Sequence, residues 1–546
     1  MAGMVGEFGS NRRVAFEPAA EMMARRGQIS TFIDRPQFRL LFVGSPQTGL
    51  HAAKNTIAAI CGSPHTATGE KLTAHRLVLE YERTGTIEPA RIRGHFSLVL
   101  ADLRKQTVVL CRDALAVTPL HTIDMGQDVV FSTEYKAILD ASGHDRGLDF
   151  AAIDYFLRTG WTPAGRTFFS AVKPLAPGQV SLFSVGGVRA RVDVPHWRLP
   201  AGVGRPMETS QLSNALERSV QRFLEIGGPN IGVMLSGGID SALIAALLRR
   251  ARPQQDICAL TVGYGQTDPE ILGARSTAAA LGLEHLELIV AIEELEDLVP
   301  ASIWAMENVG GHDEYPCLFG LARRSCGQVD AIFSGNLSDT LFAGMASHRR
   351  FLTGAGQQAR PLGVRGAILY ETEFDPIPAQ PKSYTLSEEL FSALRSRDER
   401  MSAQEIFASY AGSEFMMPYG DRDVIDIALR TPDDQKLNPI RNKVILREVA
   451  SRILPSEIAN RPKSIQQLPY DGSMRAFLLS KLEKVAASEN GASTVIRADY
   501  ISQAASALRF RCDRSRVHDA WNIMAFDYWC QTFLSRPVLA AKASAW

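Results

Sequence analysis

The chain has 546 residues, and this length predicts more than one hydrophobic core, most simply two domains. Lys and Arg together number 59, as do Asp and Glu, so the chain has no excess of positive charge that would favour a nucleic-acid partner. Its content of 45% hydrophobic residues excludes a disordered chain. Seven scattered cysteines without a CxxC pair argue against a zinc site and a redox dithiol, and they favour a reducing, cytoplasmic location. No apolar run is long enough to predict a membrane span.

Short β-type runs separated by turns fill the first part of the chain, which we assign to a domain of residues 1–200. The expected strands include Arg39–Val43, Phe96–Leu100, Thr107–Cys111, Val129–Ser132 and Gln179–Phe183. Residues 200–206 are rich in Pro and Gly and predict a linker.

Helices and strands alternate after this linker, in a second domain assigned to residues 207–546. The expected helices are 212–224, 242–250 and 274–281, and the expected strands are 231–235, 257–262 and 285–290. This alternation predicts an α/β fold with a doubly wound parallel sheet, followed beyond Leu386 by a mostly helical part. Ligands in such sheets bind at the carboxyl ends of the strands.

The segment VMLSGGIDS, from Val233 to Ser241, lies at one of these strand ends. Its glycines allow the backbone to approach a ligand closely, and free N–H groups at a helix N-terminus bind anions. Hydroxyl groups add donors, and an aspartate can hold Mg²⁺. We therefore predict a pyrophosphate-binding loop, with an ordinary glycine-containing turn as the alternative. Its binding residues are Ser236, Gly237, Gly238, Asp240 and Ser241.

A second polar segment is expected to converge on the same loop. The run Ala331–Phe333 predicts a strand, and Asp339 follows shortly after it. Asp240 and Asp339 would then lie at the ends of adjacent strands and could share one Mg²⁺, which usually takes one or two protein carboxylates. The alternative for Asp339 is helix capping.

A third segment supplies positive charge. On a helix, Lys443 and Arg447 would be four residues apart and share a face, and Lys463 follows later. Such spacing usually marks a solvated basic face. A site that releases pyrophosphate needs cations, however, because charge grows on the leaving group.

Several motifs in sequence order resemble the asparagine synthetase superfamily over nearly the whole chain. In the carboxyl half they are SGGIDSALIAALL, IFSGNLSDTLFAG, MPYGDRDVIDIAL and LNPIRNKVILREVASRILPSEIANRPK. In the amino half, RGHFSLVLADLRKQTVVLCRDALAVTPL and FSTEYKAIL are similar to a class II glutaminase. The resemblance implies an Ntn-type αββα sandwich, followed by an ATP-pyrophosphatase domain with a helical C-terminal part.

The chain departs from this family at two important positions. Ala2 stands where the family's glutaminase has its nucleophilic cysteine, and a methyl group cannot attack an amide. Asn336 stands where asparagine synthetases carry a glutamate, and an amide is not a base at neutral pH. β-lactam synthetases close their ring with a tyrosine base paired with a glutamate, and this chain shows no clear counterpart of that glutamate, although Glu399 and Glu405 lie nearby. The amino domain then resembles the inactive glutaminase domains of β-lactam synthetases and lasso-peptide cyclases.

The resemblance also implies roles for residues in the synthetase half. ATP and Mg²⁺ would be the cofactors, with Lys443 and Lys463 as catalytic cations near the phosphates. Further nucleotide-binding residues would be Val233, Leu235, Val262, Gly263 and Gly335. Glu307, Tyr315 and Asn336 are candidates for binding the acyl substrate, although packing roles for Glu307 and Tyr315 are equally compatible.

We predict a synthetase or cyclase that adenylates a carboxylate and couples it to an amine without glutamine. Specialised-metabolite biosynthesis, such as that of antibiotics, or peptide biosynthesis would be its setting. The expected partner is a small molecule or peptide that supplies the carboxylate and the amine, and the chain could act as a homodimer. One alternative is an ammonia-dependent amidotransferase. Another is a degenerate member that binds nucleotide without catalysis. A tRNA-thiolating enzyme is disfavoured because it would need paired cysteines and a basic surface.

Overall fold

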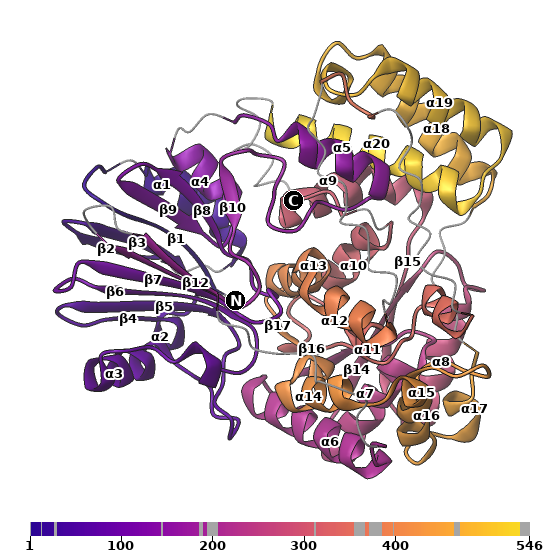
Figure 1. The fold of residues 1–546 in the computed structure, drawn as a ribbon. Coiled ribbons are helices and arrows are strands. Elements are labelled where there is room, and N and C mark those ends of the chain that lie inside the picture. The colour runs from indigo at the N-terminus through magenta and orange to yellow at the C-terminus, as the bar shows by residue number, and fades with distance from the viewer. Residues whose placement is uncertain are drawn as a thin grey trace.

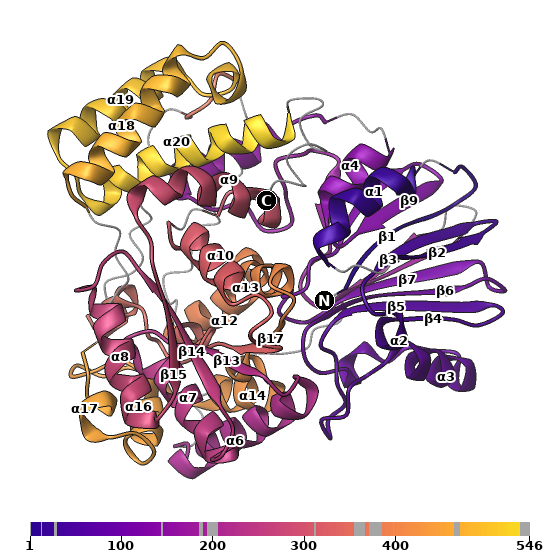
Figure 2. The same cartoon turned by 180° about the vertical axis from the view of Figure 1, so that it is seen from behind.

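The structure is a computed structural model with two β-rich layers and a separate α/β part (Figure 1, Figure 2). The described residues are 2–12, 14–26, 30–142, 146–184, 189–193, 206–310, 313–353, 366–370, 385–396, 398–462 and 470–534. The predicted linker therefore lies outside them except for Pro206. No helix in these ranges is long and apolar enough to cross a membrane.

Two antiparallel sheets of six strands each form the amino-terminal part. The first has the order β10 (Val172–Pro174), β8 (His121–Met125), β9 (Asp128–Ser132), β1 (Gly3–Phe8), β3 (Phe38–Val43) and β2 (Ser30–Arg35). The second has the order β12 (Arg189–Asp193), β11 (Gln179–Ser184), β7 (Thr107–Arg112), β6 (Phe96–Asp102), β5 (Thr56–Gly62) and β4 (Leu50–Ala52). All the predicted strands of this region are present.

Alternation of side chains along the strands explains the layering. In β3, Leu40 and Phe42 enter the core between the two sheets, whereas Leu41 and Val43 face the opposite side. Helices cover the outer faces: α1 (Phe16–Met23) and α4 (Tyr135–Ser142) on the first sheet, and α3 (Ala74–Thr84) on the second. A short helix, α2 (Pro46–Gly49), precedes β4. The result is the predicted αββα sandwich.

A parallel sheet of five strands forms the centre of the carboxyl half. Its order is β15 (Glu284–Ile289), β14 (Ile257–Gly263), β13 (Ile231–Met234), β16 (Ala331–Phe333) and β17 (Glu414–Met416). The helices α6 (Thr209–Ile226), α7 (Ile239–Ala251) and α8 (Pro269–Leu281) pack along one face. The helices α9 (Leu295–Met306), α10 (Glu314–Arg324) and α13 (Asp398–Tyr410) lie on the other (Figure 2). This confirms the predicted doubly wound sheet.

Helices complete the rest of the described chain. Shorter ones near the sheet are α11 (Ser338–Leu341), α12 (Leu386–Ser396), α14 (Arg422–Arg430), α15 (Asp433–Lys436), α16 (Val444–Ser451) and α17 (Ser456–Ala459). A separate layer holds α18 (Gly472–Ala487), α19 (Ala498–Phe510) and α20 (Arg514–Phe533), drawn in yellow tones in Figure 1. The long α20 contacts both α9 and α5 (Phe150–Thr159), so it ties the amino and carboxyl halves together.

Candidate active site

The predicted pyrophosphate loop connects the end of β13 to the start of α7. The strand ends at Met234, and the helix begins at Ile239, three residues earlier than the sequence pattern predicts. Asp240 therefore lies in the first helical turn, where the helix dipole favours a negative charge. A strand, a polar turn and a helix thus occur in the predicted order.

Three backbone N–H groups of the loop already donate hydrogen bonds to side chains of the protein. The N–H of Ser236 donates to Ser241 Oγ, and that of Gly238 donates to Ser236 Oγ, each at 3.1 Å. The N–H of Gly237 donates to Glu270 Oε2, also at 3.1 Å. The loop is therefore ordered by its own side chains and by one carboxylate from α8. No local sequence pattern points to this contribution of Glu270.

Asp240 and Asp339 converge on one cation. The ammonium of Lys443 forms ion pairs with both carboxylates. Burial alone would lower the pKa of Lys443, but Asp240 and Asp339 outweigh it and raise the pKa, so the lysine stays charged. Three segments that are distant in sequence thus place two anions and one cation beside the loop.

Two side chains that the sequence analysis did not single out hold Asp240 in place. Ser338 Oγ donates to Asp240 Oδ1 at 2.6 Å, and the hydroxyl of the buried Tyr419 donates to the Asp240 carbonyl at 3.3 Å. Both residues lie in motifs that resemble the family, but only the fold brings them to Asp240. Their contacts fix the start of α7 against α11 and against the short helix at Pro418–Gly420.

Lys443 and Asp339 differ in local structure from the expectations. Lys443 is not inside a helix but is the N-cap of α16, with a left-handed φ of 57°. Its carbonyl accepts the N–H of Arg447 at 2.8 Å. The guanidinium of Arg447 donates to the carbonyls of Asn442 and Ala459. The N-cap of α11 is Leu337, so the capping alternative for Asp339 is wrong.

Backbone strain is concentrated around this cluster. Leu337, Ala343 and Lys443 all have positive φ, at 76°, 56° and 57°. Such conformations in residues other than glycine are unfavourable and gather at functional sites. A side chain at Gly344 would also overlap the Asp339 carboxylate and the Lys443 side chain, so glycine is required for this ion pair.

The cluster fits a divalent cation. Two carboxylates that reach one ammonium can also reach one metal ion, and they are 21% and 39% exposed for Asp240 and Asp339, which leaves room for water and phosphate oxygens. In the described part of the chain no group of three or more His, Cys, Asp or Glu could hold a metal. A metal here would therefore depend on these two carboxylates together with ATP and water.

The residues predicted to flank adenine lie at the adjacent strand ends. Val233 and Leu235 are buried at the end of β13, and Val262 and Gly263 end β14 beside them. Gly335 lies against the start of α7, because a Cβ there would meet the Ser241 nitrogen at 2.8 Å. Their contact with nucleotide stays a prediction, and so does the role of Lys463, which lies outside the described residues.

Glu307 does not lie in this cluster but at the junction of the two halves. Its carboxylate accepts the backbone N–H groups of Tyr135 and Lys136, both at 2.8 Å, and pairs with the Lys136 ammonium at 3.1 Å. Its carbonyl accepts the indole N–H of Trp529 at 3.0 Å. These contacts support the packing alternative for Glu307.

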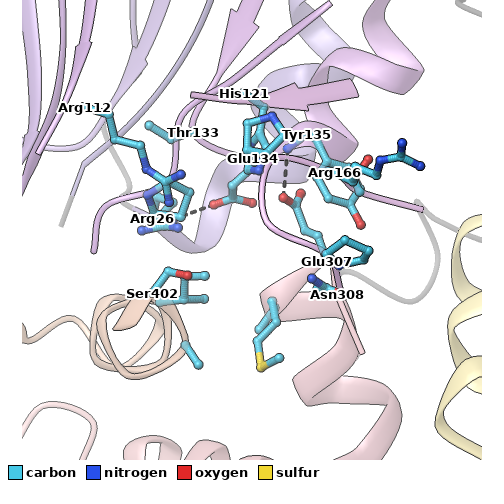
Figure 3. Close-up of a pocket in the computed structure, with 18 residues that line it drawn as sticks. Arg26, Arg112, His121, Thr133, Glu134, Tyr135, Arg166, Glu307, Asn308 and Ser402 are labelled. Carbon is cyan, nitrogen blue, oxygen red and sulfur yellow. Dashed lines mark hydrogen bonds and ion pairs between the residues drawn. The ribbon is translucent and has the colours of Figure 1, made fainter. Parts of the chain in front are cut away.

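A cavity of about 60 Å³ lies beside Glu307, between the sandwich and the helices α9 and α13. Figure 3 shows Glu134 and Glu307 close together, with Arg26 bonded to Glu134. The Lys136 ammonium also pairs with Glu134. The volume suits a few water molecules. The lining includes no residue of the pyrophosphate loop.

Tyr315 and Asn336 lie in the carboxyl half. Tyr315 is buried on α10, where its ring packs edge-on against Phe407 at 6.3 Å between centroids. Asn336 is partly exposed, and its N–H donates to Ser334 Oγ, which in turn donates to Gln404 Oε1. Asn336 is thus held three residues before Asp339, and its substrate contact stays a prediction.

The amino-terminal sandwich offers no evident sulfur nucleophile among the described residues near its start. Ala2 precedes β1 and packs against the core between the sheets. Cys61, on β5, is fully buried, and burial raises the pKa of its thiol to about 12. A thiol is reactive as the thiolate, so this cysteine cannot substitute for one at position 2.

Comparison with known proteins identifies the family of this fold. The model described as "Asparagine synthase" matches residues 211–531, which is more than half of the chain. The chain belongs to the asparagine synthase family. The model described as "Glutamine amidotransferase domain" matches residues 73–194. Both matches agree with the resemblance seen in the sequence motifs.

Relatives of this asparagine synthase family member include two kinds of enzyme. The chain is 22% identical over 503 residues to asparagine synthetase [glutamine-hydrolyzing] 1 of Bacillus subtilis (strain 168), covering 81% of the chain and 78% of that relative. It is 27% identical over 380 residues to carboxyethyl-arginine beta-lactam-synthase of Streptomyces clavuligerus, covering 68% of the chain and 64% of that relative. The chain is therefore an ATP-dependent carbon–nitrogen ligase of the asparagine synthetase type.

Proposed function

We propose that this ligase activates a substrate carboxylate as an acyl-adenylate and joins it to an amine without using glutamine. The observation that carries the proposal is the convergence of Asp240, Asp339 and Lys443 beside the SGGIDS loop. Such a cluster supplies what cleavage between the α- and β-phosphates needs: a cation site, an ammonium and an anion-binding turn.

In the first step, the substrate carboxylate attacks the α-phosphorus of ATP, and pyrophosphate leaves. The loop from Ser236 to Ser241 would bind the phosphates, and Lys443 would neutralise charge on the leaving group. Asp240 and Asp339 would hold Mg²⁺, which when bound supplies Lewis-acid stabilisation of the phosphate oxygens. In the second step, the amine attacks the acyl carbon and AMP leaves, with Lys463 near the oxyanion by resemblance to the family.

The amine is proposed to come from the substrate or a second substrate because the sandwich lacks the family's nucleophile. Ala2 carries no reactive group, and the Cys61 thiol is buried with a raised pKa. The beta-lactam-synthase relative supports ring closure or a related amide-forming step in specialised-metabolite or peptide biosynthesis. A cytoplasmic location, the domain boundary at residues 200–207 and a homodimer are further parts of this proposal.

Each of the two alternative functions has one observation in its favour. Asn336 in place of the family's acid or base favours a degenerate nucleotide-binding protein. The similarity to an asparagine synthetase, together with Ala2 at the nucleophile position, favours an ammonia-dependent enzyme. The intact carboxylate pair and its lysine favour catalysis over degeneration, since Gly344 and a strained backbone maintain this pair.

The proposal is tested by identifying the nucleotide products. The purified chain is incubated with Mg²⁺, α-labelled ATP and a panel of amino acids, N-substituted amino acids and short peptides, with hydroxylamine as a surrogate amine. We expect AMP, pyrophosphate and a hydroxamate that depend on one class of carboxylate. ADP and orthophosphate as products would contradict adenylation. Nucleotide binding without cleavage for any carboxylate, with or without ammonia, would favour the degenerate alternative.

A further inference from the structure

Glu270 and Arg461 form hydrogen bonds with the backbone N–H and the backbone carbonyl of one residue of the pyrophosphate loop, Gly237. Glu270 Oε2 accepts the Gly237 N–H at 3.1 Å, and Arg461 Nη1 donates to the Gly237 carbonyl at 3.3 Å. Glu270 comes from the first turn of α8, and Arg461 from the segment that follows α17. Two elements that belong to neither β13 nor α7 therefore determine how Gly237 is oriented.

Both side chains are themselves held in place. Asp268, the N-cap of α8, accepts the Glu270 N–H at 2.9 Å, and Glu270 is only 7% exposed. Arg461 Nη1 also donates to the Gly273 carbonyl at 2.7 Å and to Thr277 Oγ1 at 3.1 Å. Arg461 thus fastens the loop to α8 through several bonds.

In addition to these hydrogen bonds, close packing of α8 against the loop restricts the conformation of the loop. A Cβ at Gly273 would lie 2.5 Å from the Gly237 Cα, so α8 approaches the loop backbone directly. A glycine peptide without partners samples many orientations, and ordering it when an anion binds would lower affinity. Fixing Gly237 in advance therefore favours binding of phosphate by the remaining donors of the loop.

The carboxylate of Glu270 acts here through its hydrogen bond and not through its charge. A negative charge beside an anion-binding loop repels phosphate, so its electrostatic effect alone would weaken binding. A glutamine at this position keeps an oxygen acceptor of the same reach and removes the charge. The two contributions can therefore be separated by substitution.

We propose that Glu270 and Arg461 are positioning residues that fix the two peptide groups on either side of Gly237 and so set the affinity of the loop for the β- and γ-phosphates of ATP. The proposal rests on the proposed function, because it takes this loop as the pyrophosphate site. Neither side chain is assigned a contact with the nucleotide. Their effect should appear with ligands that carry a pyrophosphate group and be absent with AMP.

The test compares calorimetric affinities of the full chain for Mg-ATP, Mg-pyrophosphate and AMP. The variants are Glu270→Ala, Glu270→Gln and Arg461→Ala. Arg249→Ala is a matched control, since Arg249 donates in the same way to the carbonyls of Leu281, Gln255 and Gly282, away from the loop. Glu294→Ala is the second control, since its carboxylate accepts the Ala291 N–H at 2.7 Å.

We expect Glu270→Ala and Arg461→Ala to weaken Mg-ATP and Mg-pyrophosphate binding by about tenfold, equivalent to about 1.4 kcal/mol. AMP affinity should change by less than about twofold. Glu270→Gln should bind Mg-ATP and Mg-pyrophosphate at least as tightly as the wild type, because the hydrogen-bond acceptor is kept and the repelling charge is removed. Both controls should keep wild-type affinities. Amide exchange of residues 233–241 should become faster in Glu270→Ala and Arg461→Ala but not in Glu270→Gln.

Unchanged pyrophosphate affinity and exchange in Glu270→Ala and Arg461→Ala would overturn the proposal. A Glu270→Gln variant as weak as Glu270→Ala would overturn it too, because an oxygen acceptor at this position would then not be sufficient. Parallel loss of AMP binding would also overturn it, because the effect would then not be specific to the pyrophosphate group. Failure of the wild type to bind Mg-ATP is a separate result, because it rejects the proposed function itself.

Discussion

Lys443 forms an ion pair with Asp240, which lies 203 residues earlier in the chain. The lysine is at the N-cap position of α16 and the aspartate lies in the first turn of α7, so the pair joins the starts of two helices beside the pyrophosphate loop. Any cation that binds Asp240 and Asp339 must compete with this ammonium. Lys443 would then be released toward the phosphates, as its proposed role requires.

Removing either carboxylate should abolish most of the ATP cleavage. We expect Asp240→Asn and Asp339→Asn each to lower the rate of AMP and pyrophosphate formation by at least about two orders of magnitude, by loss of charge stabilisation through the metal. Asp330→Asn is the matched control, because Asp330 precedes β16 and bonds to Asn230 at the opposite end of the sheet. Near wild-type rates in both Asp240→Asn and Asp339→Asn would remove these residues from the mechanism.

Glutamine should not be hydrolysed. Neither the wild type nor Ala2→Cys is expected to release glutamate from glutamine, because the wild type lacks a nucleophile and recognisable glutamine-binding motifs are missing between Phe8 and His75. Glutamate is measured by an enzyme-coupled assay, with a glutamine-hydrolysing asparagine synthetase as the positive control. Glutamate release by the wild type would contradict the account, and release by Ala2→Cys alone would show that a glutamine pocket persists.

Glu307 should matter for stability more than for substrate binding. Glu307→Ala removes one of the carboxylates that pair with the Lys136 ammonium, whose side chain is only 1% exposed. It also removes the acceptor of the backbone N–H groups of Tyr135 and Lys136. We expect a loss of about 3 kcal/mol in the free energy of unfolding, as for a broken buried pair. Glu296→Ala is the control, because the Glu296 side chain is 50% exposed in its pair with Lys481 and should contribute less than about 1 kcal/mol. Equal small losses in urea denaturation would contradict a structural role for Glu307.

Lys436 should make stability depend on pH. Its side chain is buried, and burial lowers its pKa to about 8, below the value of 10.5 for a free lysine. Between these two values the unfolded chain binds the proton and the folded chain does not, so this lysine adds stability as pH rises through that window. Below about pH 8 both states are protonated and the contribution is lost.

Lys436→Met removes this effect and should stabilise the protein at pH 7 by about 1–3 kcal/mol. The difference in melting temperature between the variant and the wild type should then shrink as pH rises from 8 to 10. A difference that stays constant over this range would show that Lys436 titrates normally. Thermal unfolding followed by circular dichroism at several pH values gives this comparison.

The strands of both halves could be predicted from local pattern, whereas the αββα layering of the first half is an expectation from the family resemblance. The apolar runs of β3 and of the segment before SGGIDS indicate strands without any knowledge of neighbours. Asp240 and Asp339 could be grouped because parallel strands end at one edge of a sheet. Lys443 could be placed with them because release of pyrophosphate needs cations and because the motifs resemble the family. Their convergence on one ammonium is what the structure adds.

Contacts between distant side chains could not be predicted in the same way. Glu270 and Arg461 have no local signal, since one is an ordinary helix-start glutamate and the other an isolated arginine. Lys443 was expected to share a helix face with Arg447, but its left-handed backbone conformation places it before the helix and not inside it. For Glu307 the sequence left a substrate role and a packing role open, and only its contact with the backbone at the start of α4 shows what it binds.

The central claim is that nitrogen enters the amide from an amine substrate and not from glutamine. The most direct measurement is mass spectrometry of the amide product formed from ATP, the carboxylate and an unlabelled amine in the presence of glutamine labelled with ¹⁵N at the amide. The account predicts an unlabelled product, with one AMP released for each amide formed. A product that carries ¹⁵N, with glutamate released in equal amount, would contradict it.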